Sequence, residues 1–587
     1  MIPQRLNALR TWMRKHDMDA FIFPSTDPHN GEYVPDHWKG REWVSGFNGS
    51  AGTAVVTLQD AALWTDSRYF IAAAQQLEGT GFVLMRERMP ETPSVAEWIA
   101  ESAGSGRIGM DGMVNSVSIV NSLKDQLRHL GDFEVVTDYD PLEDLWTDRP
   151  GVPDDPVVLH PIEFSGEAAT SKIQRVRHAI VEMHASAILV TALDDVAWTL
   201  NLRGNDVHCN PVFVSYLLIT LERVVLFVDK VKITSEVADY LQEMGVETAG
   251  YGKVADFLSK LGDQCLLMDS NKVNDTLFHA VRNPICATSP IPAMKAVKNT
   301  VEMDGFRRAM IRDGVAMVKF LCQLQQRVEQ GVETELSVDE RLTALRAEDA
   351  WFRGNSFDTI AAYGAHGAVV HYEATPETNV MLQPRGFLLL DSGGQYLDGT
   401  TDITRTIALG ELTEREREVY TLVLKGHIQL QLLKFPSGAC GSQLDAVARR
   451  DLWKAGLNFM HGTGHGVGAF LNVHEGPHQI RQEWWPAPLR PGMNVTDEPG
   501  IYIENEFGVR IENTLLIVPY MKTEMGEFLQ FETLTLCPID LTPIIKSMMT
   551  DEEVLWLNDY HHTVYERLSP YLNDVETAWL RNACRPL

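Results

Sequence analysis

Apolar residues recur at helical spacing near the start of the chain and again after residue 170, and each series runs into a short apolar strand. In residues 6–16, apolar side chains from Leu6 to Met13 share one helical face ahead of the strand AFIFP. Residues 173–184 form a similar helix before the strand AILVT. A Trp beside a glycine-containing turn and further apolar strands follow in both. This alternation predicts two α/β domains related by duplication.

A third segment has a different pattern. Residues 299–324 predict a long helix, in which Phe306, Met310, Met317 and Phe320 recur at helical spacing. Strands and turns are expected to dominate after about residue 355, which indicates an α+β domain with antiparallel hairpins. The predicted fold is therefore multidomain, with two α/β domains before an α+β domain.

Three proline-rich stretches set the expected boundaries, because proline at high density interrupts both helices and central strands. They lie near residues 150–161, 284–292 and 538–543. The predicted domains are residues 1–155, 156–290, 291–537 and a C-terminal extension, 538–587, whose Trp, Tyr and Leu residues recur at helical spacing. In that extension we expect His561 and His562 to face solvent.

Composition narrows the classes of function. The 587 residues carry a net charge of −29, which disfavours binding to nucleic acid or to an anionic membrane surface. No apolar stretch approaches the roughly 18 residues of a membrane span, and the N-terminus resembles an amphipathic helix rather than a signal peptide. The seven cysteines form no CxxC motif. These features predict a cytoplasmic protein.

Acidic residues concentrate on two predicted hairpins. In the first, FLLLDSGGQYLDGTTDITRT, an apolar strand ends at Asp391, and Asp402 begins the next strand 11 residues later. Two carboxylates brought together beside apolar strands repel each other unless a cation neutralises them. For this hairpin alone, a pair of solvated turn residues is the favoured interpretation.

The second hairpin, NVTDEPGIYIENEFGVRIENTLLIV, places Glu498 at the end of a strand. Arg510 and Glu512 then share a face of a later strand, among apolar neighbours. A carboxylate in such surroundings needs a partner, either Arg510 or a metal ion. Three further acids are interpreted as surface residues: Asp497, Glu504 and Glu506.

Between the hairpins lies HGTGHGVGAFLNVHEGPH, in which alternating glycines exclude a stable helix. His461, His465 and His474 lie on or beside this glycine-rich loop. Two Asp, two Glu and one His form an oxygen-rich ligand set, which suits hard divalent ions such as Mn²⁺ better than structural Zn²⁺. Four carboxylates with one imidazole can hold a pair of metals that activates a bridging water to hydroxide.

These motifs resemble a known family. DSGxxYxDGTTDxTRT, HGTGHGVGxFLNVHEGP, VTDEPG and RIEN together are similar to the pita-bread metallopeptidases, and most of all to the long, three-domain cytosolic Xaa-Pro aminopeptidases (aminopeptidases P). LWTDSRYF, AWTLNLRG and HYEATPETN extend the resemblance along the chain. It implies two creatinase-like N-terminal domains and a pita-bread catalytic domain that hydrolyses the N-terminal Xaa-Pro bond of peptides with proline second.

The resemblance also assigns residues. The implied ligands of two Mn²⁺ ions are Asp391, Asp402, His465, Glu498 and Glu512. Of these, Asp402 and Glu512 would bridge the metals, and Glu498 would take the proton of the nucleophilic water. The implied substrate-site residues are Arg68, His371, His461, His474 and Arg510, with His474 at the scissile carbonyl and Arg510 at the proline pocket.

Two alternative functions and the oligomeric state remain open. A prolidase shares the five ligands, although the middle domain and the length favour the aminopeptidase. A non-catalytic peptide-binding protein of the same fold would be expected to have lost ligands, whereas this chain has all five. In the resembling family the C-terminal extension helps to form a homodimer, which we expect here as an alternative to simple packing on its own domain.

Overall fold

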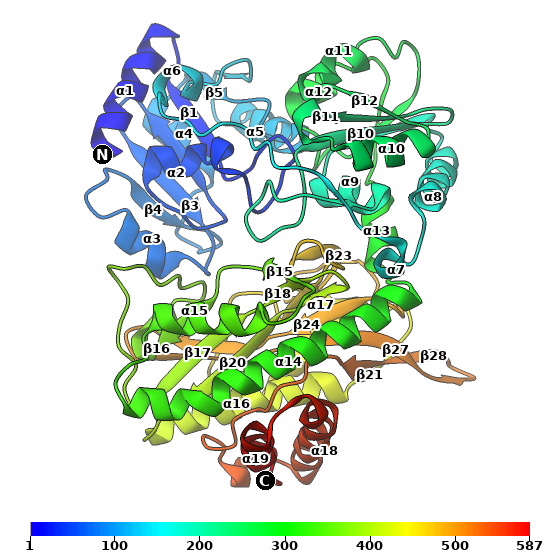
Figure 1. Cartoon of the computed structure of the whole chain (residues 1–587). Helices are drawn as coiled ribbons and strands as arrows, with labels where there is room; N and C mark the ends of the chain where they lie inside the picture. Colours follow the sequence, from blue (N-terminus) through cyan, green and yellow to red (C-terminus); the bar gives the residue numbers. More distant parts are fainter. Residues whose placement is uncertain (1) are drawn as a thin grey trace. The chain divides into compact units, whose positions relative to one another are not determined.

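The computed structural model describes residues 2–587 and divides into two compact units. The first unit comprises the chain up to His160 together with Glu167–Ile291, and the second comprises Pro161–Gly166 together with Pro292–Leu587. Figure 1 shows the path of the chain through them.

The first unit contains two six-stranded sheets. In the first sheet the order is β4 (Val83–Arg86), β3 (Ala61–Thr65), β2 (Thr53–Thr57), β1 (Ala20–Pro24), β5 (Gly106–Met110) and β6 (Phe133–Val136). In the second it is β12 (Val246–Ala249), β11 (Val224–Val228), β10 (Ser215–Thr220), β8 (Ala187–Val190), β13 (Leu266–Met268) and β14 (Pro284–Cys286).

The two sheets match strand for strand. In each, the first strand in the chain pairs antiparallel with the second and parallel with the fifth, and both outer pairs are parallel. The preceding helices also correspond: α1 (Ile2–Lys15) leads into β1, and α8 (Ala169–Glu182) leads into β8. The predicted relationship between the two N-terminal α/β domains is therefore present in their topology. The exact boundaries at residues 155, 290 and 537 stay a prediction.

The second unit contains a 30-residue helix, α14 (Thr300–Glu329), at whose N-terminus Asn299 and Glu302 form a capping box. The four residues that predicted it, from Phe306 to Phe320, are all buried. Figure 1 shows α14 and α16 (Glu414–Leu432) flanking the strands β16 (Ile360–Tyr363), β17 (Phe387–Ser392) and β20 (Ile403–Ala408). These strands form one antiparallel sheet, in the order β16, β17, β20.

The other strands of this unit form four small sheets. One has the order β21 (Lys434–Pro436), β28 (Gly526–Thr533), β27 (Asn513–Thr523) and β24 (Asn494–Asp497), and another β15 (Phe352–Asn355), β18 (Gly394–Tyr396) and β19 (Gly399–Thr400). Two are pairs: β22 (Gly464–Gly466) with β23 (Glu475–Ile480), and β25 (Gly500–Ile503) with β26 (Phe507–Arg510).

Strands do not dominate this unit as completely as the sequence pattern predicts. After residue 355 the chain also forms α16 and α17 (Gly441–Lys454). The helix α16 is buried on several sides, so its apolar residues do not keep to one stripe and its periodicity is weak. Its N-terminus nevertheless carries a capping box, Thr413 with Glu416, which is a signal in the sequence.

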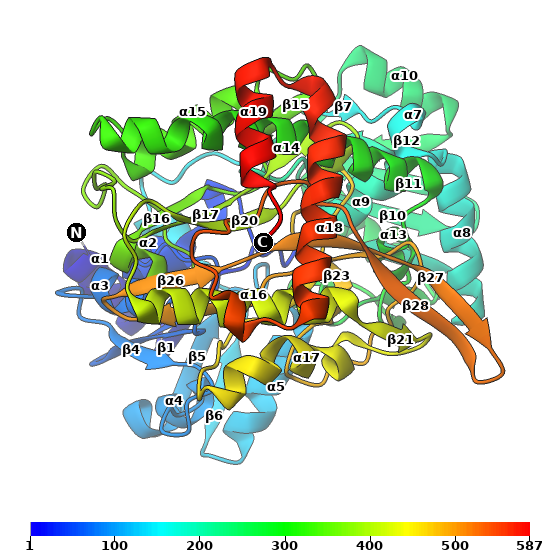
Figure 2. The same cartoon turned by 90° about the horizontal axis from the view of Figure 1, so that it is seen from below.

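The C-terminal extension forms α18 (Asp551–Leu568) and α19 (Asp574–Ala583), which Figure 2 shows beside each other. Leu557, Val564 and Leu580 are buried in one core with residues of α16. The expectation that His561 faces solvent is wrong: its side chain is buried, and its Nε2 accepts a hydrogen bond from the backbone N–H of Ile539. The apolar face of α18 includes this histidine because it covers the segment around Ile539.

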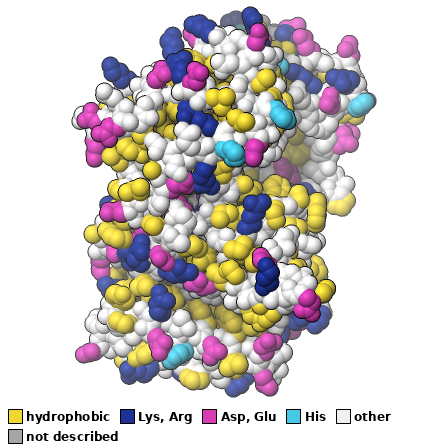
Figure 3. All heavy atoms as spheres, turned by 90° about the vertical axis from the view of Figure 1, so that its right-hand side faces the viewer, with side chains coloured by type: hydrophobic (Ala, Val, Ile, Leu, Met, Phe, Trp, Pro, Cys, Tyr) yellow, Lys and Arg dark blue, Asp and Glu magenta, His cyan; other side chains and the backbone are white. Residues whose placement is uncertain are grey.

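Figure 3 shows one face of the molecule. On the face in Figure 3, acidic, basic and apolar side chains are interspersed. Within residues 2–587, none of the helices combines the length and the apolar character needed to cross a bilayer.

Candidate metal centre

The first acidic hairpin is built by β17 and β20. The apolar run from Phe387 to Leu390 is buried and delivers Asp391, which pairs in register with Thr404 of β20. Asp402 directly precedes β20. Both side chains are buried, with Asp391 7% and Asp402 4% exposed. The solvated-turn interpretation of the two aspartates is therefore wrong.

The second acidic hairpin meets the first. Glu498 follows β24, and Glu512 lies in the short interruption between β26 and β27, where the sequence predicts one continuous strand. The N–H of Glu512 donates to the carbonyl of Thr404, and the Thr404 hydroxyl donates to Glu512 Oε2 at 2.7 Å. Thr404 thus fixes the backbone and the side chain of Glu512 beside the first hairpin.

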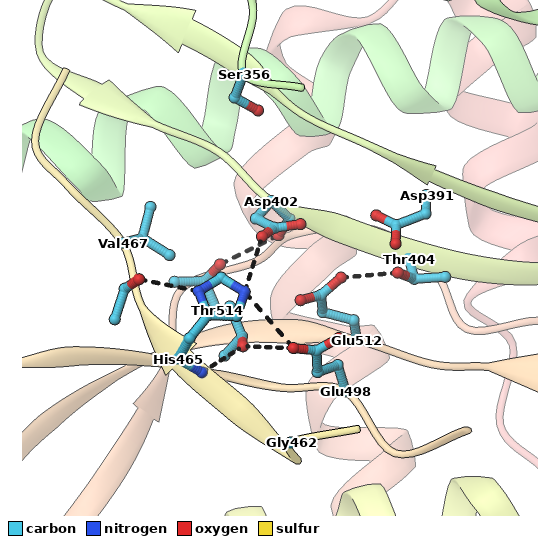
Figure 4. Close-up of polar contacts among 12 residues, drawn as sticks. Ser356, Asp391, Asp402, Thr404, Gly462, His465, Val467, Glu498, Glu512 and Thr514 are labelled. Carbon is cyan, nitrogen blue, oxygen red and sulfur yellow. Dashed lines mark hydrogen bonds and ion pairs between the residues drawn. The ribbon is translucent and has the colours of Figure 1, made fainter. Parts of the chain in front are cut away.

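His465 comes from the strand β22 and faces these acids. Its Nδ1 lies 2.9 Å from the carbonyl of Gly466, which assigns the proton to Nδ1 and directs the Nε2 lone pair outward. Nε2 lies 3.5 Å from Asp402 Oδ2 and 3.5 Å from Glu498 Oε1. Figure 4 shows the side chains of Asp402, His465, Glu498 and Glu512 turned toward one another.

Close backbone packing explains why glycines flank this histidine. A Cβ at Gly464 would lie 1.8 Å from the carbonyl oxygen of Thr496, in β24. The Thr496 hydroxyl in turn accepts from the N–H of His465 at 3.0 Å and contacts Glu498 Oε1 at 3.4 Å. The alternating glycines therefore let β22 approach β24 closely enough to bring His465 and Glu498 together.

The carboxylates repel one another. Burial, followed by the charges of Asp391 and Glu498, raises the pKa of Asp402 well above its ordinary value. Burial, followed by the charges of Asp402, Asp391 and Glu498, raises the pKa of Glu512 well above its ordinary value. Burial raises the pKa of Glu498 to about 7, with Arg510 opposing the rise and Asp391 adding to it.

These acids fit a metal centre. Ligand atoms of Asp402, His465 and Glu512 all lie within 4.8 Å of one another. Asp391 Oδ1 is buried and has no hydrogen-bond partner among the described residues 2–587, although Oδ2 is paired with Arg510. A buried, unpaired carboxylate oxygen beside three mutually repelling acids is the arrangement that a divalent cation stabilises.

A chain of hydrogen bonds leads from Asp391 to His461. Arg510 donates to Asp391 through Nε and Nη2, and its Nη1 donates to the hydroxyl of Tyr502 at 2.7 Å. That hydroxyl lies 2.8 Å from His461 Nε2. Sequence reasoning missed Tyr502, because an isolated Tyr in a hairpin carries no signal until β25 and β26 pair, which sets Tyr502 opposite Gly508.

The other predicted substrate-site residues are placed as follows. The ring of His474 packs edge-on against that of His465, with centroids 4.3 Å apart. His371 is half-buried in the turn after β16, next to Tyr372. Arg68 belongs to the other unit, where it holds Asp66 through two nitrogens and contacts Glu32 at 3.4 Å.

One acid assigned to the surface is instead buried. Asp497 has no exposed surface, and its Oδ2 lies 3.1 Å from Nδ1 of His427 and 3.1 Å from Nε2 of Gln431, both on α16. The interpretation of Asp497 as a surface acid is therefore wrong, whereas Glu504 and Glu506 are exposed as expected. The partners of Asp497 are some 70 residues away in the sequence and could not be read from its neighbours.

Comparison with known proteins identifies the family. The profile of metallopeptidase family M24 matches residues 304–519, and two profiles of the creatinase/prolidase N-terminal domain match residues 5–140 and 148–302. Aminopeptidase P2 of Arabidopsis thaliana is 39% identical, across 100% of this chain and 89% of its own length. This chain belongs to the aminopeptidase P family of M24 metallopeptidases. The predicted resemblance and fold class are confirmed.

Solved structures agree with the assignment to aminopeptidases P. An X-prolyl aminopeptidase from Caenorhabditis elegans, described as a cytosolic enzyme with a di-nuclear active site, has a TM-score of 0.96 and 34% identity, with 100% of both chains covered. An Xaa-Pro dipeptidase from Bacillus anthracis has a TM-score of 0.52 and 27% identity, and covers 64% of this chain and 99% of its own. Similarity over the full length of the chain is thus found with the aminopeptidase P, not with this dipeptidase.

Proposed function

We propose that this chain is an Xaa-Pro aminopeptidase, which hydrolyses the bond after the first residue of peptides with proline second. The observation that carries the proposal is the convergence of buried carboxylates and His465 in a chain similar over its full length to aminopeptidases P. An Xaa-Pro bond is a tertiary amide without an N–H, so its hydrolysis needs a site that does not depend on that donor.

The residues that would hold two divalent ions are Asp391, Asp402, His465, Glu498 and Glu512. We propose Mn²⁺ as the native ion, since the set is rich in oxygen and has one imidazole. When bound, the pair would supply Lewis acidity toward the scissile carbonyl and toward water.

The protein's own groups would then divide the remaining work. Glu498 would accept the proton of the attacking water, since its carboxylate lies at the centre with Oε1 3.5 Å from His465 Nε2. His474, packed against His465, would donate to the carbonyl oxygen as negative charge develops there. His371, His461 and Arg510 would hold the peptide and its proline ring, and Arg68 stays a predicted substrate-binding residue.

The test is the release of the N-terminal residue from an Xaa-Pro-Yaa tripeptide, by chelated enzyme and after Mn²⁺ is restored. Xaa-Ala-Yaa and an Xaa-Pro dipeptide serve as comparisons. Cleavage of the proline tripeptide alone supports the proposal. Preference for the dipeptide would make the chain a prolidase, and metal binding without any cleavage would make it a peptide-binding protein.

Matched variants connect the activity to the site. Asp391→Asn removes a ligand charge and is expected to abolish Mn²⁺-restored cleavage. Glu504→Gln removes an exposed acid from the second hairpin and is expected to leave it intact. Equal loss in both variants would contradict the assignment of the site.

Two further properties belong to the proposal. We propose a homodimer in which the C-terminal extension takes part, because Leu555, Tyr571 and Val575 leave apolar side chains exposed there. We also propose a cytoplasmic location, since the Caenorhabditis elegans relative is described as cytosolic. Sedimentation of the wild type and of Tyr571→Ser tests the first, and fractionation of cells tests the second.

A further inference from the structure

A buried carboxylate outside the metal centre holds the segment that carries His371. Glu335 is the first residue of α15 (Glu335–Arg346), and its side chain has no exposed surface. Its carboxylate forms four hydrogen bonds, and all four partners lie between residues 363 and 380. None of these partners is among the five residues proposed as metal ligands.

Each carboxylate oxygen of Glu335 accepts two hydrogen bonds. Oε1 accepts from the N–H of Tyr363 at 2.8 Å and lies 2.8 Å from Nδ1 of His366. Oε2 accepts from the hydroxyl of Tyr372 at 2.9 Å and from the N–H of Val380 at 3.3 Å. The anion also lies in the first turn of α15, where the helix dipole favours negative charge.

The segment depends on this anchor, since it has little regular structure of its own. After β16 it contains a short 3-10 turn (Gly364–Ala368) and then no helix or strand before β17. The rings of His366 and Tyr372, both bound to Glu335, stack with centroids 4.5 Å apart. His371 immediately precedes Tyr372, so the hydroxyl bond to Glu335 limits where the His371 backbone can lie.

A second contact fixes the other side of the same turn. Gly367 packs directly on Gly508 of β26, where an added Cβ on Gly508 would lie 1.7 Å from the carbonyl oxygen of Gly367. This contact ties the turn to the strand that ends in Arg510. Glu335 and Gly508 therefore hold the segment between α15 and the hairpin of the metal centre.

We propose that Glu335 is a positioning residue for catalysis, which sets the place of His371 through Tyr372 and His366. The inference rests on the proposed function, in which His371 binds the substrate. Glu335 is not among the residues proposed to bind substrate or metal. Its loss is expected to act on turnover through His371, and not through metal content or global folding.

The test compares Glu335→Gln with Glu333→Gln. The amide of Gln has one accepting oxygen, whereas the carboxylate of Glu335 has two. Its NH₂ group would face hydrogen-bond donors that now bind a carboxylate oxygen, and the loss of those bonds is expected to loosen the segment. Glu333 is equally buried and only two residues away, but its carboxylate binds Arg327, Arg341 and Ser337, none of them in the segment. Any general effect of neutralising a buried acid here is common to both variants.

We expect Glu335→Gln to lower kcat/KM for the proline tripeptide about 10- to 100-fold, as a small displacement of a substrate-binding group can do. Bound Mn²⁺ should remain at the wild-type level. Hydrogen exchange should accelerate within residues 364–380 in Glu335→Gln but not in Glu333→Gln. Tyr372→Phe keeps the ring and removes only the hydroxyl bond to Glu335. It should lower kcat/KM and accelerate exchange in residues 364–380, each by a smaller factor than Glu335→Gln.

A double variant separates positioning from general damage. If Glu335 acts through His371, Glu335→Gln adds less than about 2-fold to the loss caused by His371→Ala alone. Multiplicative losses, wild-type kcat/KM in Glu335→Gln, or unchanged exchange in residues 364–380 would each overturn the inference. A wild type that cleaves no peptide would instead contradict the proposed function, and the exchange experiment would still decide whether Glu335 holds the segment.

Discussion

Arg510 donates twice to a single oxygen of Asp391: its Nε lies 3.0 Å and its Nη2 2.7 Å from Oδ2. The other oxygen, Oδ1, is buried without a partner among the described residues. Oδ2 is thus bound by the guanidinium of Arg510, and Oδ1 is available to a metal ion. This pairing orients Asp391 before any metal binds, as outer residues around metal ligands commonly do.

Replacement of Arg510 by Lys should therefore weaken the centre although the charge is kept. A single ammonium group cannot serve Asp391 Oδ2 and the Tyr502 hydroxyl with the planar geometry of the guanidinium. We expect kcat/KM to fall about 10- to 100-fold and Mn²⁺ affinity to fall with it. Measuring activity during a titration with Mn²⁺ gives both kcat/KM and the Mn²⁺ affinity. Arg415→Lys, at an exposed pair with Glu506, is the control, and equal effects in the two variants would argue against the role of Arg510.

Tyr502→Phe tests the next link of the same network. It removes the hydroxyl between Arg510 and His461 and keeps the ring. Loss of a bond to a charged group costs about 1.5–3 kcal/mol, so we expect kcat/KM to fall roughly 10- to 100-fold. Metal content should stay unchanged, because neither residue 502 nor His461 is proposed as a ligand. Tyr520→Phe changes an exposed Tyr and should have no effect; a reduced metal content in Tyr502→Phe would contradict this account.

Metal removal should destabilise the second unit as well as inactivate it. Without cations, the buried acids around Asp402 and Glu512 repel one another. A ligand that binds only the folded state stabilises it by about 1.4 kcal/mol for each tenfold rise above its dissociation constant. Thermal unfolding across a Mn²⁺ series should show a rising midpoint in the wild type and a weaker rise in Glu512→Gln. A midpoint independent of Mn²⁺ in the wild type would argue against this centre.

The sequence was sufficient to predict the acids of the centre, because all four lie at strand ends in the two hairpins: Asp391 and Glu498 where a strand finishes, Asp402 and Glu512 directly before a strand begins. Asp391 follows four buried apolar residues, and Glu498 follows β24. The repeated helix and strand pattern likewise predicted the two N-terminal sheets, since local periodicity alone determines those elements.

Other features required tertiary structure. Asp497 looks like a surface acid beside Glu498, but α16 brings His427 and Gln431 against it. Tyr502 gains its partners only when Arg510 and His461 converge on it. The helix α16 itself lacks an apolar stripe because several faces are buried, so only its capping box could have revealed it. Long-range partners of single polar residues leave no periodic trace in a sequence.

His561 provides a prediction about pH, since it is buried beside the exposed His562. Burial, assisted by the charge of Arg405, lowers the pKa of His561 to about 4. In the unfolded chain the ordinary value is about 6.5, so the unfolded state binds the additional proton between these two values. The contribution of His561 to stability is therefore complete above about pH 6.5 and is lost as the pH falls toward 4.

Between pH 8 and pH 5 this loss amounts to about 2 kcal/mol from His561. The urea midpoint of the wild type should fall over that range by more than the midpoint of His561→Gln, because the variant no longer takes up this proton on unfolding. His562→Gln removes the neighbouring histidine, whose ring is 69% exposed, and should keep the wild-type dependence. His478, whose pKa burial also lowers to about 4, contributes equally to all three proteins and cancels in the comparison. If His561→Gln and the wild type lost stability in parallel from pH 8 to pH 5, His561 would have to be protonated in the folded protein, and its buried contact with the Ile539 N–H could not persist.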